Sequence, residues 1–374
     1  MKILSIFGTR PEAIKLAPII KKMKHNEKIT LFSCVTAQHR HILDQVLRTF
    51  DIKPEYDLDL MTKNQDLNYL AQGILKEVSK VLVKVSPDYI LVQGDTTTAL
   101  FSSIAAFHNN IKIAHLEAGL RTNDKLSPWP EETNRRLISS LAAINFCPTS
   151  FSRDNLIREN IDKSNILITG NSVVDALLMV KEKILTNSLT KKNLSLKYNF
   201  LNNDKIKILV TLHRRESHGK HINQICIGLL ELLAEYKYLE LIVSVHPNPN
   251  VKKMITKNFA NKRNIYLIES PDYEEFVYLM INSYLILTDS GGVQEEAPSL
   301  NIPVLIARDK TERPEGVKAG SSILVGRNKE NIKSIIKEFL NNKKKYEIHS
   351  NITNPFGEGT TSDRVMKYFL DISK

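Results

Sequence analysis

The sequence predicts an α/β protein with two doubly wound, Rossmann-like domains and a cleft between them. Two observations favour this fold class: short apolar runs alternate regularly with longer helical patterns, and a polar, sequence-specific stretch follows many of the runs. The length agrees with it, because 374 residues are too many for one comfortable core and 42% hydrophobic residues suffice for two.

The apolar runs are the predicted strands. Each is apolar on both faces, which is typical of parallel strands buried under helices. The predicted strands are 2–7, 31–36, 88–93, 111–116, 144–148, 165–169, 206–212, 239–245, 264–269, 284–288, 302–307 and 321–325.

A change in composition predicts the domain boundary. Residues 169–205 become rich in Lys and Asn and contain no convincing strand, which places the connection near residues 170–180. We therefore expect an N-terminal domain over 1–170 and a C-terminal domain over 171–358. The tail over 359–374 is predicted to be a helix with Thr or Ser at its start that returns to the first domain.

The formal net charge of +11 could indicate a nucleic-acid partner. Lys and Arg are, however, spread along the whole chain without interleaved aromatic residues, so solvated helix faces explain most of them. Nucleic acid is disfavoured as a partner, whereas a small anionic substrate suits the positive charge.

The chain shows no sign of a membrane segment or a secretion signal. No apolar stretch approaches the length of a bilayer span, and "MKILSIFGTR" lacks the long apolar run and cleavage site of a signal peptide. Cys34, Cys147 and Cys226 are few, odd in number and widely spaced, which predicts buried free thiols in a reducing compartment. We expect a cytoplasmic protein without a membrane partner.

Polar stretches follow seven of the predicted strands. Ligands of open α/β sheets bind outside the carboxyl ends of the strands, so these stretches predict a site lined from both domains. They are "GTRPE", "GDTTT", "EAGLR", "HRRES", "HPNPN", "DSGGVQEE" and "RDKTERPEG".

In "TDSGGVQEEA", Ser290, Gly291 and Gly292 lie where a strand turns into a helix. Free backbone N–H groups and the helix dipole there suit a phosphate, and glycine lets the phosphate approach closely. An ordinary tight turn is the alternative. Cations for a diphosphate follow other strands: His213, Arg214, Arg215, Arg308 and Arg313.

Metal and cofactor signatures are weak or absent. His213, His218 and His221 could bind a metal, but "HRRESHGKH" has no Cys and its neighbours are cationic, so a metal site is disfavoured. No GxGxxG follows the first strand and no GxxxxGK[ST] occurs, so dinucleotide and kinase chemistry lack their usual phosphate loops. Two doubly wound domains with a phosphate cradle and no cofactor loop are typical of the GT-B architecture of sugar-nucleotide enzymes.

The stretch "SPWPEETNRR" places Glu131 and Glu132 behind Trp129 and two prolines. A helix start is the plain interpretation, because Pro130 suits a first helical position and acids in the first turn face the positive end of the helix dipole. A functional interpretation makes one carboxylate part of the active site.

Long motifs, in order along almost the whole chain, resemble the non-hydrolysing UDP-N-acetylglucosamine 2-epimerases of bacteria. They include "FGTRPEAIKLAP", "GDTTT", "HLEAGLRT", "SPWPEE", "ITGNSVVDAL", "HRRES", "VHPNPNV", "LTDSGGVQEEAPSL" and "ERPEGV". The resemblance implies a GT-B isomerase that interconverts UDP-N-acetylglucosamine and UDP-N-acetylmannosamine by eliminating and re-adding UDP. It also implies a homodimer and no NAD or metal cofactor.

The same resemblance implies the roles of individual residues. The positions that match the family's catalytic residues are Asp95, Glu117, Glu131 and His213. Those that match its UDP-binding pattern are Arg10, Lys15, Ser290, Gly291, Gly292, Glu296 and Arg313, with Phe276 expected near the uracil.

Some family members bind a second substrate molecule as an activator. Here Gln38 is present, but His41 stands where some relatives carry Gln, and "MTKNQDLNYL" offers no arginine, so the sequence does not predict this activation. Two other functions stay open: a hydrolysing relative that releases UDP and N-acetylmannosamine, and a GT-B glycosyltransferase or sugar-nucleotide sensor. "GDTTT" and "SPWPEE" favour the non-hydrolysing epimerase.

Overall fold

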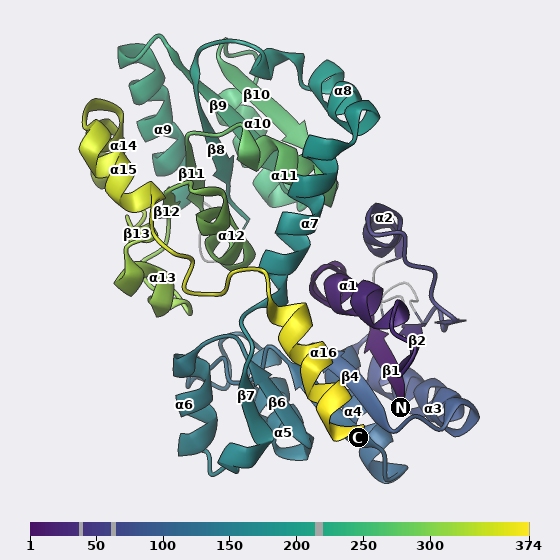
Figure 1. The fold of residues 1–374 in the computed structure, drawn as a ribbon. Coiled ribbons are helices and arrows are strands. Elements are labelled where there is room, and N and C mark those ends of the chain that lie inside the picture. The colour runs from purple at the N-terminus through teal and green to yellow at the C-terminus, as the bar shows by residue number, and fades with distance from the viewer. Residues whose placement is uncertain (37–39, 61–64, 214–219, 374) are drawn as a thin grey trace. The chain divides into compact units, whose positions relative to one another are not determined.

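The computed structural model describes residues 1–36, 40–60, 65–213 and 220–373. These residues form two compact units. The N-terminal unit comprises Met1–Ala176 and Phe356–Lys374, and the C-terminal unit comprises Leu177–Pro355. Each unit contains its own parallel sheet with helices, so the predicted α/β class with two doubly wound domains is confirmed (Figure 1).

The sheet of the N-terminal unit has seven strands in the order β3-β2-β1-β4-β5-β6-β7. All neighbouring pairs are parallel. The chain leaves β1 toward one edge and returns to β4 on the other side, so the topological switch point lies between β1 and β4. The strands are β1 (Lys2–Phe7), β2 (Thr30–Val35), β3 (Tyr56–Asp57), β4 (Tyr89–Gln93), β5 (Lys112–Leu116), β6 (Ile144–Cys147) and β7 (Ile166–Ile168).

Two helices of the N-terminal unit that follow strands of the switch point begin with polar caps. Thr9 and Glu12 form a capping box at α1, and the Thr96 hydroxyl accepts a hydrogen bond from the Ala99 N–H at the start of α4. The helices are α1 (Arg10–Lys24), α2 (Arg40–Thr49), α3 (Leu67–Val85), α4 (Thr97–His108), α5 (Glu131–Leu141), α6 (Ser150–Arg158) and α16 (Thr361–Ile372), with the 3-10 turn Lys163–Asn165 and the start of α7 (Ser172–Thr186).

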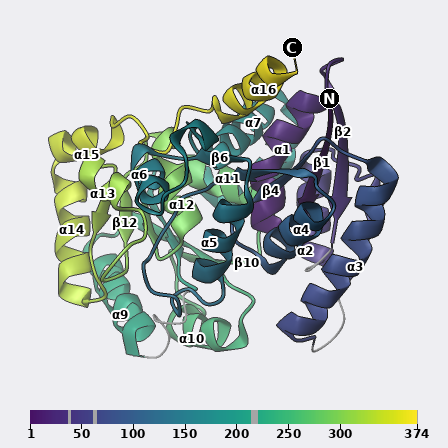
Figure 2. The ribbon, with the colours of Figure 1, turned by 90° about the horizontal axis from the view of Figure 1, so that it is seen from below.

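The C-terminal helix α16 completes the core of the N-terminal unit. Phe369 on α16 packs edge-on against Tyr89 of β4 and Phe146 of β6, with ring centroids 5.3 and 6.0 Å apart. Figures 1 and 2 both show α16 beside α1. Because Phe369 is fully buried, this last helix is an integral layer of the unit.

The C-terminal unit has a six-stranded sheet in the order β10-β9-β8-β11-β12-β13, again all parallel. Its switch point lies between β8 and β11. The strands are β8 (Ile206–Thr211), β9 (Leu239–Val245), β10 (Ile265–Glu269), β11 (Leu285–Thr288), β12 (Val304–Ile306) and β13 (Ser322–Leu324). The helices are α8 (Ser188–Lys197), α9 (Lys220–Glu235), α10 (Pro249–Phe259), α11 (Tyr273–Ile281), α12 (Gly291–Glu296), α13 (Pro314–Ala319), α14 (Lys329–Asn341) and α15 (Lys343–Ser350), with 3-10 turns at Asn199–Leu201 and Ala297–Leu300.

Every predicted strand is found, with ends that differ by at most two residues. Only β3 was not predicted, because it is two residues long and neither residue is buried. The Lys- and Asn-rich stretch forms α7, α8 and a 3-10 turn, and the chain passes from one unit to the other within α7. In the part of the chain that is described, no helix is both long and apolar enough to span a bilayer.

Candidate active site

In the N-terminal unit, three predicted site residues follow three neighbouring strands. Arg10 comes after β1, Asp95 after β4 and Glu117 directly after β5, and β4 lies between the other two strands. Because parallel strands end at one edge of the sheet, these residues gather at the switch point, where α/β proteins bind ligands.

Glu117 is held in an uncommon backbone conformation. Its φ is 64°, and every other non-glycine residue with positive φ in the described ranges is Asn, Asp or Ser. The left-handed backbone conformation costs free energy for a residue with a longer side chain, so the surrounding structure must hold the backbone of Glu117 in place.

Three side chains donate hydrogen bonds to the Glu117 carboxylate. Oε1 accepts from the Lys15 ammonium and, at 2.9 Å, from Nδ2 of Asn171. Oε2 accepts from the amide of Gln93. The side chain of Glu117 is only 7% exposed, so its carboxylate is a largely buried anion with a paired cation and two neutral donors.

Lys15 therefore lies with the carboxylates of the N-terminal unit. Its ammonium pairs with Glu117, and the nucleotide-binding role that the resemblance implies for Lys15 stays a prediction.

Glu12 connects the turns that follow β1 and β4. One oxygen accepts from the backbone N–H groups of Gly8 and Thr9 at 3.1 and 2.8 Å, and the other from the Thr96 hydroxyl at 2.7 Å. Burial raises the pKa of this carboxyl group, and its hydrogen bonds oppose that rise. Glu12 thus fixes the backbone on either side of the switch point.

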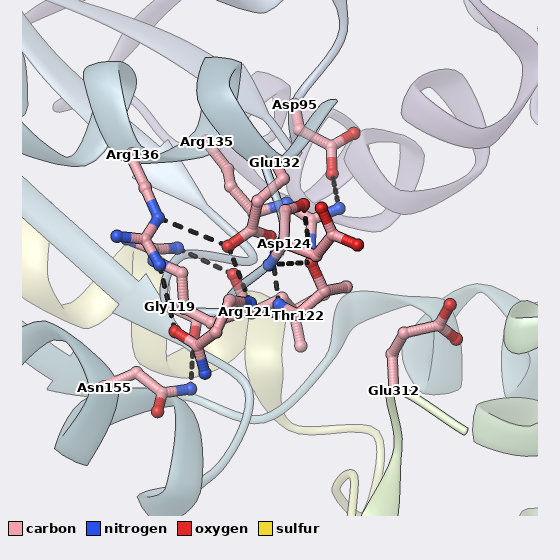
Figure 3. A network of polar contacts seen from close by, with 12 residues as sticks. Asp95, Gly119, Arg121, Thr122, Asp124, Glu132, Arg135, Arg136, Asn155 and Glu312 are labelled. Carbon is pink, nitrogen blue, oxygen red and sulfur yellow. Dashed lines mark hydrogen bonds and ion pairs between the residues drawn. The ribbon is translucent and has the colours of Figure 1, made fainter. Parts of the chain in front are cut away.

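Asp95 is bound by a residue from α5. The Arg135 guanidinium donates to Asp95 through Nη2 and lies 3.3 Å from Glu132 through Nη1, as Figure 3 shows. Asn134 adds a 2.9 Å bond from its side chain to the backbone oxygen of Asp95. Helix α5 therefore positions the turn after β4.

The adjacent Glu131 and Glu132 have different environments. Glu132 is fully buried, and its oxygens accept from the backbone N–H groups of Thr122 and Asn123 at 3.0 and 3.2 Å. Glu131 is half-buried, and its Oε2 is enclosed but accepts no hydrogen bond from any residue that the structure describes. Glu132 thus holds the loop at Thr122 and Asn123, whereas one oxygen of Glu131 has no hydrogen-bond partner among the described residues.

Both glutamates lie in the first turn of α5, as the helix-start interpretation predicts. Pro130 is the cap residue before the helix and not its first helical residue. The polar network of Figure 3 joins Glu132, at this helix start, to Asp95 through Arg135.

In the C-terminal unit, His213 follows β8 and Asp289 follows β11, the two strands at the switch point. The fully buried Asp289 accepts two hydrogen bonds from the backbone N–H of His213, at 3.0 and 3.1 Å. The imidazole Nδ1 lies 3.5 Å from Asp289 and the ring stacks on His246 at 5.4 Å. The ring of His213 is therefore oriented by two neighbours at the edge of the sheet.

The Ser-Gly-Gly turn lies where the sequence predicts it, between β11 and α12. Ser290 caps α12, and Gly291 is its first residue. Arg313 lies against this turn: its Nε donates to Glu295 at 2.6 Å, and a Cβ atom at Gly291 would be only 2.6 Å from the guanidinium carbon. Glycine at 291 is what lets Arg313 approach the start of α12.

The other predicted site residues of the C-terminal unit lie on α12, on α11 and after β12. Glu296, the last residue of α12, accepts a 2.7 Å hydrogen bond from the hydroxyl of Tyr273. Phe276 is half-buried one turn later on α11. Arg308 pairs with Glu312 at 2.7 Å. Gln38, Arg214, Arg215 and His218 lie outside the described residues.

Sequence reasoning did not single out Glu12, Arg135, Asn171 or Asp289. Thr9 and Glu12 are a capping box in "TRPE", which could have identified Glu12 as a buried linker. Asp289 was quoted within "TDSGG" but given no role. Arg135 and Asn171 lie in the quoted stretches "SPWPEETNRR" and "ITGNSVVDAL" but were given no role, because their partners are 40 and 54 residues away.

The family model described as UDP-N-acetylglucosamine 2-epimerase matches residues 21–370. The chain is 46% identical to the UDP-N-acetylglucosamine 2-epimerase of Escherichia coli K12 over 367 residues, 98% of each protein. The crystal structure of UDP-GlcNAc 2-epimerase from Neisseria meningitidis bound to UDP-GlcNAc is similar with a TM-score of 0.94 and 45% identity, over 99% of this chain and 100% of that one. The enzyme of Methanocaldococcus jannaschii in complex with UDP-GlcNAc and UDP has a TM-score of 0.83 at 36% identity, over 99% of this chain and 100% of that one.

Proposed function

Because the chain belongs to the UDP-N-acetylglucosamine 2-epimerase family, we propose that it reversibly inverts C2 of UDP-N-acetylglucosamine to give UDP-N-acetylmannosamine. The solved relatives named above were crystallised with this nucleotide sugar or with UDP, which supports the substrate. We assign the sugar chemistry to the N-terminal unit, and UDP binding to the C-terminal unit together with Arg10 of the N-terminal unit.

The difficulty of the reaction is the C2 proton. It is not α to a carbonyl, so a carboxylate near neutral pH cannot remove it at a useful rate without prior activation. Breaking the C1–O bond first solves this problem, because the electron-deficient C1 then acidifies the proton on C2.

In the proposed path, the C1–O electron pair leaves with UDP and an oxocarbenium-like centre forms at C1. Loss of the C2 proton to a carboxylate then gives 2-acetamidoglucal and UDP. In the return direction, a proton reaches C2 on the opposite face and a diphosphate oxygen re-forms the bond to C1. The cycle conserves all atoms and consumes no redox cofactor.

The environments of the three carboxylates favour different roles. Both oxygens of Glu117 already accept hydrogen bonds, so this group best supplies fixed negative charge beside the cation-like C1. Glu131 has an enclosed oxygen with no partner in the described chain, so it is suited to exchange a proton with C2. Asp95, positioned by Arg135, is the candidate on the other face.

For the leaving UDP we assign His213, Arg10, the Ser290–Gly292 turn and Arg313. His213 is oriented by Asp289 and His246, which suits a group that meets developing charge on the diphosphate. Glu296 is assigned to the nucleoside, with Phe276 near the uracil. The observation that carries the whole proposal is the contrast between the saturated Glu117 and the unpartnered oxygen of Glu131.

We also propose a cytoplasmic homodimer. Large apolar side chains are exposed on the outer helices of the N-terminal unit: Tyr69 and Val83 on α3 and Phe107 on α4 are 55%, 70% and 60% exposed. Burying them against a second copy would remove this surface from water. Analytical ultracentrifugation at micromolar concentration should give twice the chain mass of 42.6 kDa, and a monomer would contradict the proposal.

Proton NMR of the purified protein with UDP-N-acetylglucosamine tests the activity. The anomeric signal of UDP-N-acetylmannosamine should appear and reach an equilibrium with the substrate. Accumulation of free N-acetylmannosamine and UDP would identify a hydrolysing enzyme. Binding of UDP without turnover would favour a sensor, and transfer of the sugar to an added acceptor a glycosyltransferase.

A further inference from the structure

Asn171 connects the Glu117 carboxylate to the start of helix α7. We infer that Asn171 is a positioning residue that fixes Glu117 for the reaction. The inference rests on the proposed function, because the readout is the role of Glu117 in turnover. Asn171 lies within the motif "ITGNSVVDAL", but none of the roles assigned above includes it.

Asn171 uses each of its polar groups. Its Nδ2 donates to Glu117 Oε1 at 2.9 Å, and its Oδ1 accepts from the N–H of Val173 at 3.1 Å. Its backbone N–H donates to the oxygen of Phe356 at 2.7 Å. Asn171 thus caps α7, contacts the returning chain before α16 and holds the carboxylate.

This geometry fixes the orientation of the amide. The N–H of Val173 can only donate, so it must face Oδ1, and a carboxylate only accepts, so it must face Nδ2. Unlike Ser or Asp, Asn can therefore both cap α7 and donate a hydrogen bond to Glu117. Ser could cap the helix but is too short to reach the carboxylate, and Asp could cap it but would present an acceptor to an acceptor.

Glu117 needs such support because of its own conformation. With φ at 64°, its backbone persists only where neighbouring groups hold it. The charged or titratable groups that interact with this carboxylate include Lys15 from α1, which pairs with it, and His115 from β5. The side chain of Lys15 is flexible, so its charge attracts the carboxylate without fixing its orientation. The planar amide of the buried Asn171 fixes that orientation.

Substitutions that preserve the cap of α7 but remove the hydrogen bond to Glu117 distinguish the two roles of Asn171. We expect Asn171→Ser to lower kcat about 10-fold, with KM and the Kd for UDP within about twofold of wild type. Asn171→Asp should lower kcat further, and the pH below which kcat falls should rise by about one unit, because a second carboxylate disfavours the charged form of Glu117. Asn187→Ser is the matched control, since Asn187 caps α8 through the N–H of Thr190 away from these groups.

A double-mutant cycle tests whether Asn171 acts through Glu117. In a Glu117→Gln background, Asn171→Ser should change kcat by less than about twofold. An Asn171→Ser enzyme with wild-type kcat, or one in which only KM changes, would overturn the inference. So would equal effects of Asn171→Ser in both backgrounds.

The unfolding free energy gives an independent readout. If the wild-type protein produces no epimer, the proposed function fails, but the contact can still be measured by thermal or urea unfolding. The effects of Asn171→Ser and Glu117→Gln on stability should then be non-additive, while those of Asn187→Ser and Glu117→Gln should add. Additivity of the first pair would overturn the contact itself.

Discussion

The guanidinium of Arg135 on α5 donates a hydrogen bond to the carboxylate of Asp95 after β4, although the two residues are 40 positions apart. The same side chain reaches the buried Glu132 through its other Nη atom, at 3.3 Å. Arg135 therefore connects a candidate catalytic group to the most buried carboxylate of α5.

Replacing this arginine should impair turnover more than folding. A lysine ammonium is a single point and cannot reproduce the two-armed contact, so we expect Arg135→Lys to lower kcat by about 10-fold or more. Steady-state kinetics provide the measurement. Arg153→Lys is the control, because Arg153 pairs with its neighbour Asp154 on the surface of α6, and it should retain wild-type kcat.

The two adjacent glutamates should respond differently to the same substitution. Glu131→Gln should lower kcat by roughly 10²-fold and leave the unfolding temperature unchanged, because its enclosed oxygen has no protein partner in the described chain. Glu132→Gln should cost about 2 kcal/mol of stability. The new NH2 group would face a backbone N–H donor from which the carboxylate now accepts a hydrogen bond. If Glu131→Gln destabilised the protein as much as Glu132→Gln, the assignment of roles would be wrong.

A substitution of Gly291 tests the proposed diphosphate site. In Gly291→Ala the new methyl group would lie 2.6 Å from the guanidinium carbon of Arg313 and push this flexible side chain away. We expect UDP binding, measured by calorimetry, to weaken about 10-fold. Gly73→Ala on α3, outside the assigned diphosphate site, is the control: a Cβ atom there would lie 3.9 Å from Leu60, so UDP affinity should stay within about threefold. Equal affinities for the wild type and Gly291→Ala would place the diphosphate elsewhere.

His115 should make stability depend on pH. Its Nε2–H donates to the oxygen of Gly94 at 2.7 Å, and burial lowers its pKa to about 4 from an ordinary 6.5. Between these two pH values the unfolded chain therefore binds one more proton than the folded chain. The stability that the protein gains from a neutral, buried His115 is complete above pH 6.5 and is lost as the pH falls toward 4.

In that window, His115→Gln should reduce the slope of unfolding free energy against pH by up to about 1.4 kcal/mol per pH unit. Chemical denaturation at several pH values measures it. Replacing the exposed His108 in the same way should leave the slope unchanged. An unchanged slope in His115→Gln would contradict a neutral buried imidazole.

The sequence predicted the strands well because parallel strands buried on both faces are unbroken apolar runs, such as "LELIVSV" for β9. The helix-start pattern did not separate Glu131 from Glu132, and only the family resemblance singled out Glu131. Both lie in the first turn of α5, and the loop at Thr122 and Asn123 decides which carboxylate is saturated. Asn171 and Arg135 were not predicted for the same reason: their partners are close only after the sheet has formed. β3 was missed because two partly exposed residues leave no pattern.

Incorporation of solvent deuterium tests the proposed mechanism most directly. In D2O, without added nicotinamide or metal, UDP-N-acetylmannosamine formed from UDP-N-acetylglucosamine should carry deuterium at C2, and the recovered substrate should acquire it as well. Glu131→Gln should slow this exchange by roughly 10²-fold. Epimer that fully retains its C2 proton would contradict removal of that proton to a carboxylate, and with it the elimination and re-addition of UDP.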